Sequence, residues 1–292
     1  MNTNVLHMKT NSILRALLAS AAGLALPAFG QINTSDFSTA SGLQLNGDAS
    51  IVGSALRLTP AAFFQAGSAF TASTITLAPN VSFSSFFTFR ISGSDGAGDD
   101  DGPGADGFAF VVQTNSNNSL GIGGGGLGYL GIPNSLGVEF DTYGNGPGLG
   151  DPDGNHVNFN FGGAFSPAGN AAIIPTRLNN GNIWSAWVDY NGATNALELR
   201  LVEGSLLRPL APVLSTTVDL ATVFGSSNTF VGFTGGTGGG FENHDILSWE
   251  FRDTFAPITS GLETVPEPST YSAFGAALLF GAVAFRRRRK HC

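Results

Sequence analysis

The central part of the chain is a series of short segments in which apolar and polar side chains alternate, separated by Gly, Asn and Pro. Alternation with a period of two residues, in segments rich in Phe, Val and Thr, predicts antiparallel β-strands. The clearest segments are residues 55–58, 81–91, 108–113, 137–141 and 157–161. No stretch between the two ends of the chain has the spacing of an amphipathic helix, so we expect no helix longer than about three turns in this region.

Two further alternating segments predict a hairpin. Residues 184–190 and 196–202 flank a Gly-containing turn at residues 191–195. Many short strands joined by Gly-rich turns are typical of a sandwich or a jelly roll. The expected fold class is therefore all-β, with one antiparallel β-sandwich over about residues 31–256.

Composition agrees with one folded domain and excludes several classes of protein. The 292 residues are 42% hydrophobic and include 41 Gly that do not recur every third position, which excludes a disordered or collagen-like chain. Residues 31–260 hold 6 Arg, no Lys and 19 Asp or Glu, a net charge of −13. This acidic segment has no basic surface for nucleic acid. Cys292 is the only cysteine, so the chain forms no internal disulfide and no cysteine-based zinc site.

Both ends of the chain look like targeting segments. At the N-terminus, Lys9 and Arg15 precede an apolar stretch over residues 16–26, which indicates a signal peptide over residues 1–30, starting at Met1 or Met8. At the other end, Val-Pro-Glu-Pro-Ser at 265–269 precedes an apolar run at 271–285 and a basic block at 286–290. The run is short for a membrane span, but the basic block would hold its C-terminal end in the cytoplasm.

The C-terminal arrangement resembles the PEP-CTERM sorting signal of Gram-negative bacteria, preceded here by a linker at residues 257–264. The resemblance implies transient anchoring in the inner membrane, recognition by an exosortase, removal of the tail and delivery to the cell surface or an extracellular matrix. A tail anchor that is never processed is the alternative.

Candidate chemistry gathers after one predicted strand. Glu139 and Asp141 point to one face of it, because side chains alternate along a strand, and two adjacent carboxylates repel unless a cation holds them. The next fifteen residues add further oxygen and nitrogen donors: Tyr143, Asn145, Asp151, Asp153 and His156. Carboxylates, carbonyls and an amide suit Ca²⁺, whereas an imidazole with carboxylates suits Mn²⁺ or a similar transition ion. A solvated acidic surface is the alternative.

These residues also carry a resemblance. Val-Glu-Phe-Asp-Thr-Tyr-Gly-Asn at 138–145, Asp-Pro at 151–152 and His156 look like the metal-binding stretch of legume and other L-type lectins. Segments 105–110, 184–191 and 231–249 resemble further parts of the same domain. The resemblance covers most of residues 31–256 and implies a concanavalin-like sandwich that binds carbohydrate and is not an enzyme.

The resemblance implies two ions. Glu139, Asp141, Asp151 and His156 would bind the transition ion. Calcium would share Asp141 and Asp151 and would add the backbone carbonyl of Tyr143 and the side chain of Asn145. In the family, the peptide bond that corresponds to Ala105-Asp106 is cis.

The resemblance also implies a site for a glycan or exopolysaccharide. Its contacts would be the Asp106 and Asn145 side chains, the ring of Tyr143, and backbone N–H groups in two glycine loops, represented by Gly125, Gly126, Gly239 and Gly240. Because Gly239 and Gly240 have no side chain to select a sugar epimer, the preferred sugar stays open. The acidic loop at residues 95–101 has no counterpart in the family pattern, and we expect it to be solvated, with a further calcium loop as the alternative.

Two other classes of function compete with a lectin. A jelly-roll glucanase would need a second carboxyl on the same strand face after Asp141, where this chain has Tyr143. A structural matrix or adhesion protein would keep the sandwich without binding sugar. The glycine run at 121–126 matches a dinucleotide fingerprint only formally, because no helix is expected after it.

Overall fold

The computed structural model describes residues 32–259. The expected signal peptide at 1–30 and the sorting tail from residue 265 lie outside the described residues. Among residues 32–259, no helix has the length and apolar character needed to cross a membrane.

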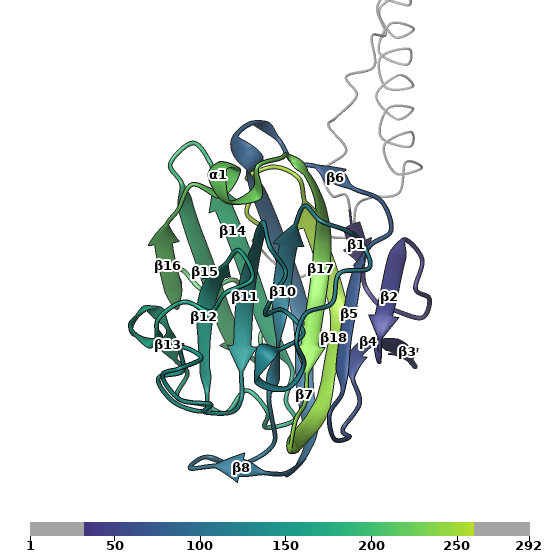
Figure 1. Cartoon of the computed structure of the whole chain (residues 1–292). Coiled ribbons are helices and arrows are strands. Elements are labelled where there is room, and N and C mark those ends of the chain that lie inside the picture. Colours follow the sequence, from purple (N-terminus) through teal and green to yellow (C-terminus); the bar gives the residue numbers. More distant parts are fainter. Residues whose placement is uncertain (1–31, 260–292) are drawn as a thin grey trace, which may run out of the picture.

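Two antiparallel sheets pack face to face (Figure 1). The back sheet runs in the order β16 (Leu214–Thr217), β15 (Ala196–Glu203), β14 (Trp184–Asn191), β7 (Phe83–Gly96), β18 (Gly240–Arg252), β4 (Ala55–Thr59) and β3 (Ser50–Val52), with β1 (Ile32–Thr34) paired to β18. The front sheet runs β13 (Ala172–Ile173), β12 (His156–Phe161), β11 (Ser135–Asp141), β10 (Gly107–Gln113), β17 (Asn228–Gly236), β5 (Ala66–Thr71) and β2 (Leu43–Gly47), with β6 (Ile75–Thr76) paired to β17. The predicted antiparallel β-sandwich is confirmed.

Helical structure is sparse in the described residues. The one α-helix there, α1 (Leu220–Phe224), has five residues, and three 3₁₀ turns complete the set: η1 (Pro79–Val81), η2 (Gly124–Gly126) and η3 (Ala168–Asn170). The absence of long helices between residues 32 and 259 is as expected. The predicted hairpin is also confirmed, because β14 and β15 pair from Trp184 with Glu203 to Asn191 with Ala196.

The core lies between the sheets and is rich in phenylalanine. In β11, Val138 and Phe140 point into it and are fully buried. The ring of Phe140 stacks on that of Phe108 from β10, with 4.8 Å between centroids. Alternation along β11 then places Glu139 and Asp141 on the opposite face, so core packing aims the two carboxylates.

Three front-sheet strands meet at one end of the sandwich, near the small hairpin formed by β8 (Gly98–Asp99) and β9 (Gly102–Pro103) (Figure 1). Gly107, the first residue of β10, lies opposite Asp141 of β11 and Gly236 of β17. The loops that precede or follow these strands therefore gather at this end.

Candidate functional site

The end of the front sheet carries a buried cluster of acidic residues and one histidine. Asp141 at the end of β11 lies opposite His156 at the start of β12, and Asp151 comes from the loop between them. One ligand atom from each of these three residues lies within 4.8 Å of the others. Glu139 joins them, with its Oε1 atom 3.3 Å from Nε2 of His156. All four side chains are buried.

The described part of the protein supplies no Lys or Arg to this cluster; its arginines form their ion pairs elsewhere. Burial, together with the charges of Asp151 and Glu139, raises the pKa of Asp141 well above its ordinary value. Burial also raises the pKa of Asp151 to about 6. Carboxylates this close to each other favour a bound cation, because the cation removes both the repulsion and the cost of desolvation.

The orientation of His156 fits a metal ligand. Its Nδ1 atom lies 3.2 Å from the backbone carbonyl of Asp153, while Nε2 is buried without a hydrogen-bond partner and lies 3.8 Å from Oδ1 of Asp151. Burial lowers the pKa of His156, but the close approach and negative charge of Glu139, together with the charges of Asp151 and Asp153, outweigh this effect and raise it. An imidazole anchored through one nitrogen, with the other facing carboxylates, is a common arrangement for a transition-metal ligand.

The loop after β11 is tied to the same carboxylates. The backbone N–H of Tyr143 donates to Oδ1 of Asp141 at 2.8 Å, and that of Asn145 donates to Oδ2 of Asp151 at 2.7 Å. Tyr143 is half-buried and Asn145 is exposed. These two hydrogen bonds hold Tyr143 and Asn145, the residues expected to complete a second, calcium-like position, next to Asp141 and Asp151.

Asp106 lies beside this loop. The peptide bond between Ala105 and Asp106 is cis, as the resemblance implied. The Asp106 side chain is buried, and its Oδ2 atom has no hydrogen-bond partner. Burial raises the pKa of Asp106 to about 6, although His244 and a hydrogen bond from Asn145 act in the opposite direction. An unsatisfied acceptor of this kind suits a ligand hydroxyl.

The first glycine loop packs against the same residues. A β-carbon on Gly125 would lie 2.6 Å from Oδ1 of Asn145, so any larger residue there would have to displace the Asn145 side chain. Gly125 is half-buried, whereas Gly126 is buried below it. The run at 121–126 forms turn η2 and no α-helix begins there, which agrees with a loop and not with a dinucleotide motif.

The second glycine loop also reaches Asp106. Gly238 lies beside Asp106, because a β-carbon there would be 3.1 Å from Oδ2 of that residue. Gly239 is exposed, whereas Gly240 is buried as the first residue of β18 and lies against Ala105. The structure therefore brings Gly238, and not Gly240, to the carboxylate.

A buried polar network beneath Asp106 was missed by sequence reasoning. Glu242 of β18 accepts hydrogen bonds from Ser94 at 2.8 Å, from Asn179 at 2.9 Å and from Thr142. Despite burial, hydrogen bonding to His244 and the charge of that residue lower the pKa of Glu242. The network fixes Thr142, the residue between Asp141 and Tyr143.

Two further buried polar residues, Asn160 and His244, support the site from β12 and β18. Asn160 shares a strand face with His156 in β12, and its Nδ2 atom donates to Oε2 of Glu139. His244 connects to the network through Glu242: its Nε2 atom lies 3.3 Å from Oε1 of Glu242, and its Nδ1 atom lies 2.6 Å from the hydroxyl of Thr59. These polar residues at every second position were the available sequence signal.

The acidic loop is only partly solvated. Asp95 and Asp100 are exposed, as expected. Asp99, however, accepts a hydrogen bond from the backbone N–H of Gly144 at 2.8 Å, and Asp101 pairs with Arg177 at 3.3 Å. The expectation of a solvated loop is wrong for Asp99, which is half-buried because the β8–β9 hairpin docks on the loop that follows β11, whereas Asp101 stays exposed.

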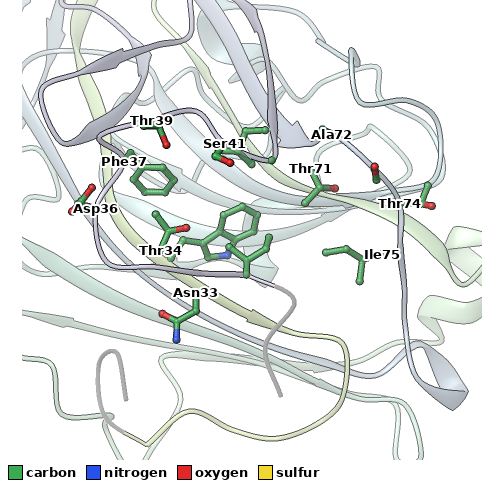
Figure 2. A pocket seen from close by; sticks show the side chains of 15 residues that line it. Asn33, Thr34, Asp36, Phe37, Thr39, Ser41, Thr71, Ala72, Thr74 and Ile75 are labelled. Atoms are coloured by element: carbon green, nitrogen blue, oxygen red, sulfur yellow. The ribbon is translucent and has the colours of Figure 1, made fainter. Parts of the chain in front are cut away.

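A separate cavity of about 420 Å³ lies between the N-terminal segment and the β5–β6 region (Figure 2). Its apolar lining includes Phe37, Ile75 and Trp249, and hydroxyl side chains such as Thr34, Thr39 and Ser41 also line it. Asp36 is the one acidic or basic residue in its lining. The cavity therefore lacks the charged donors that gather at the end of the front sheet.

Comparisons with known proteins identify the family of the chain. The sequence model of the legume lectin domain matches residues 30–265, and that of the PEP-CTERM protein-sorting motif matches residues 264–289. An L-type lectin-domain containing receptor kinase VIII.1 from Arabidopsis thaliana is 35% identical over 193 residues, which is 64% of this chain and 26% of that protein. A receptor kinase S.7 from Oryza sativa subsp. japonica is 34% identical over 211 residues, 68% of this chain and 28% of that protein. The chain thus spans about a quarter of these relatives.

Solved structures give the same result. A lectin from Bauhinia forficata in complex with GalNAc matches with a TM-score of 0.60 and 25% identity, covering 76% of this chain and 96% of that one. Basic winged bean lectin with Tn-antigen matches with a TM-score of 0.60 and 27% identity, covering 75% and 96% of the two chains.

Proposed function

Because the chain belongs to the legume lectin domain family, we propose that it is an exported, metal-dependent lectin that binds a glycan at the end of the front sheet. The observation that carries the proposal is the buried cluster around Asp141, which lies beside an unsatisfied carboxylate oxygen of Asp106. A cation-dependent carboxylate cluster next to an open acceptor is suited to holding sugar hydroxyls against competition from water.

Four residues would hold the transition ion, Mn²⁺ or a similar metal: Glu139, Asp141, Asp151 and His156. Their donor atoms are close together and buried, and Nε2 of His156 has no other partner. Calcium would use Asp141, Asp151, the carbonyl of Tyr143 and the side chain of Asn145. When bound, the ions would neutralise the carboxylates and fix the loop that carries Tyr143 and Asn145.

The sugar would lie over this loop. Asp106 and Asn145 would bind its hydroxyls, with backbone N–H groups from the Gly125 and Gly239 loops, and the ring of Tyr143 would stack on its apolar face. The related lectin from Bauhinia forficata was solved with GalNAc. N-acetylgalactosamine is therefore a sensible first probe.

The sorting motif supports delivery to the outside of a Gram-negative cell. An exosortase would recognise the box at residues 265–269 and remove the tail, after transient anchoring in the inner membrane. Mass spectrometry of the surface-delivered protein should give a C-terminus near this box. A chain that still ends at Cys292 would favour an unprocessed anchor.

A glycan array, read with and without a chelator, tests the function. A lectin binds printed glycans in the presence of Ca²⁺ and Mn²⁺ and loses them in EDTA. A protein that binds no glycan under either condition would instead be a matrix or adhesion protein. Release of reducing sugar from a β-glucan would indicate a glucanase and would contradict the proposal of a non-enzymatic lectin.

A further inference from the structure

The loop that joins β4 to β5 presents two aromatic side chains to solvent. Phe64 is 80% exposed and Phe63 is 55% exposed. An isolated exposed apolar residue needs no explanation, but two adjacent phenylalanines next to a ligand site do. Neither residue belongs to the candidate metal or sugar contacts described above.

This loop is held in one conformation. Phe64 has a φ of 56°, in the left-handed region that residues with a β-carbon rarely adopt. Its N–H donates to the carbonyl of Gly238 at 3.2 Å. The N–H of Gln65 donates to the hydroxyl of Thr237, and the N–H of Thr237 donates to the carbonyl of Gln65, both at 2.9 Å. The ring of Phe63 packs edge-on against Phe241, with 4.6 Å between centroids. A strained, exposed aromatic residue that its neighbours hold in place suggests a functional role.

The position of Phe64 is continuous with the proposed sugar site. Phe64 lines a shallow depression of about 400 Å³ together with Gly124 and Gly238. These two glycines also approach Oδ2 of Asp106, at 3.8 and 3.1 Å from an ideal β-carbon. The depression therefore adjoins the Asp106 carboxylate through these two glycines.

We infer that Phe64 forms the wall of a second sugar subsite, so that the protein recognises a glycan of at least two residues. The ring would stack on the apolar C–H face of the sugar next to the one held by Asp106. Glycines on the opposite side of the depression leave room for this second ring. The inference rests on the proposed function, because it needs a sugar at Asp106.

The test compares two ligands that differ by one sugar. We would titrate the purified protein, in Ca²⁺ and Mn²⁺, with the methyl glycosides of galactose, N-acetylgalactosamine, mannose and glucose and with disaccharides that end in each of them. Phe64→Ala should weaken binding of the preferred disaccharide about tenfold, as expected for one aromatic contact, and should change binding of the matching monosaccharide less than about twofold. Phe64→Tyr should retain the disaccharide affinity.

Phe255→Ala is the matched control. Phe255 is also an exposed phenylalanine, but it follows the C-terminal end of β18, whereas the depression beside Phe64 lies near the start of that strand. Equal affinity of wild type and Phe64→Ala for the disaccharide would overturn the second subsite and leave the proposed lectin intact. An equal loss of both ligands would also overturn it, since Phe64 would then act on the first sugar or on the fold. A wild-type protein that binds no sugar would overturn both proposals.

Discussion

The two sheets treat their buried carboxylates differently. On the outer face of the back sheet, the buried acids Asp245 and Asp189 each have an arginine: Asp245 accepts two hydrogen bonds from Arg57 at 2.8 and 2.9 Å, and Arg208 lies 2.6 Å from Asp189. At the end of the front sheet, Asp141 and its neighbours have no such partner among the described residues. Arginines of the chain therefore neutralise Asp245 and Asp189. A bound metal ion is the cation that suits Asp141 and its neighbours.

The two groups of buried carboxylates should differ in how much they depend on metal. A buried ion pair is already neutral, so it depends little on the solution around the protein. A buried group of carboxylates with one histidine stays costly until an ion binds, so its stability and its geometry depend on metal. Removal of metal should therefore affect the cluster at the end of the front sheet and leave the ion pairs of the back sheet unchanged.

The largest effect is expected from Asp141→Asn. Since Asp141 would serve both ions, the variant should lose both and should no longer gain thermal stability on addition of Ca²⁺ and Mn²⁺. In EDTA it should be at least as stable as the wild type, because one uncompensated buried charge is gone. Differential scanning calorimetry with and without EDTA measures both effects; an ion-dependent melting temperature equal to that of the wild type contradicts the metal assignment.

Asp245→Asn probes the back sheet. The substitution leaves the half-buried Arg57 and the nearby Arg90 without their shared carboxylate, and should cost about 3 kcal/mol of unfolding free energy. The loss should be the same in EDTA and in Ca²⁺, as measured by denaturant unfolding. A loss that appears only with metal would mean that the two regions are not independent.

Asp106→Asn separates sugar from metal. It should lower the affinity for a glycan found on the array by about 2 kcal/mol, because one charged acceptor is lost, and should leave both ion affinities within about twofold. Isothermal titration with ions and then with glycan gives the two numbers. Loss of the ions in this variant would show that Asp106 is itself a ligand.

Acidification should release the ions. Burial raises the pKa of Asp151 to about 6 and that of Asp141 well above its ordinary value, so Asp151 binds a proton as the pH falls from 7 to 5, and protons compete with metal. The affinity for Ca²⁺ should fall about tenfold from Asp151 alone. Titrations at pH 7, 6 and 5 measure this; constant affinity would place calcium elsewhere.

Much of the fold followed from local pattern, and parts of the site did not. Alternation in β11 was enough to predict that Val138 and Phe140 point inward and Glu139 outward. The hydrogen bonds to Glu242 join residues more than sixty positions apart, so no local pattern reveals them. The left-handed conformation of Phe64 depends on Gly238, a residue of another loop.

The exact positions of the glycines near the start of β18 also could not be predicted from local sequence. Only the packing of β18 decides that Gly240 is buried and that Gly238 reaches Asp106. Likewise, the position of Asp99 depends on where the β8–β9 hairpin docks. Side chains whose partners lie on distant strands were therefore visible only in the structure.

Counting the ions tests the central claim most directly. Purified protein, stripped of metal and titrated calorimetrically at pH 7 with Mn²⁺ and then with Ca²⁺, should bind one ion of each per chain, and Asp141→Asn should bind neither while Asp245→Asn binds both. Absence of ion binding by the wild type, or binding that Asp141→Asn leaves unchanged, would contradict the claim that metal holds the carboxylates of the front sheet.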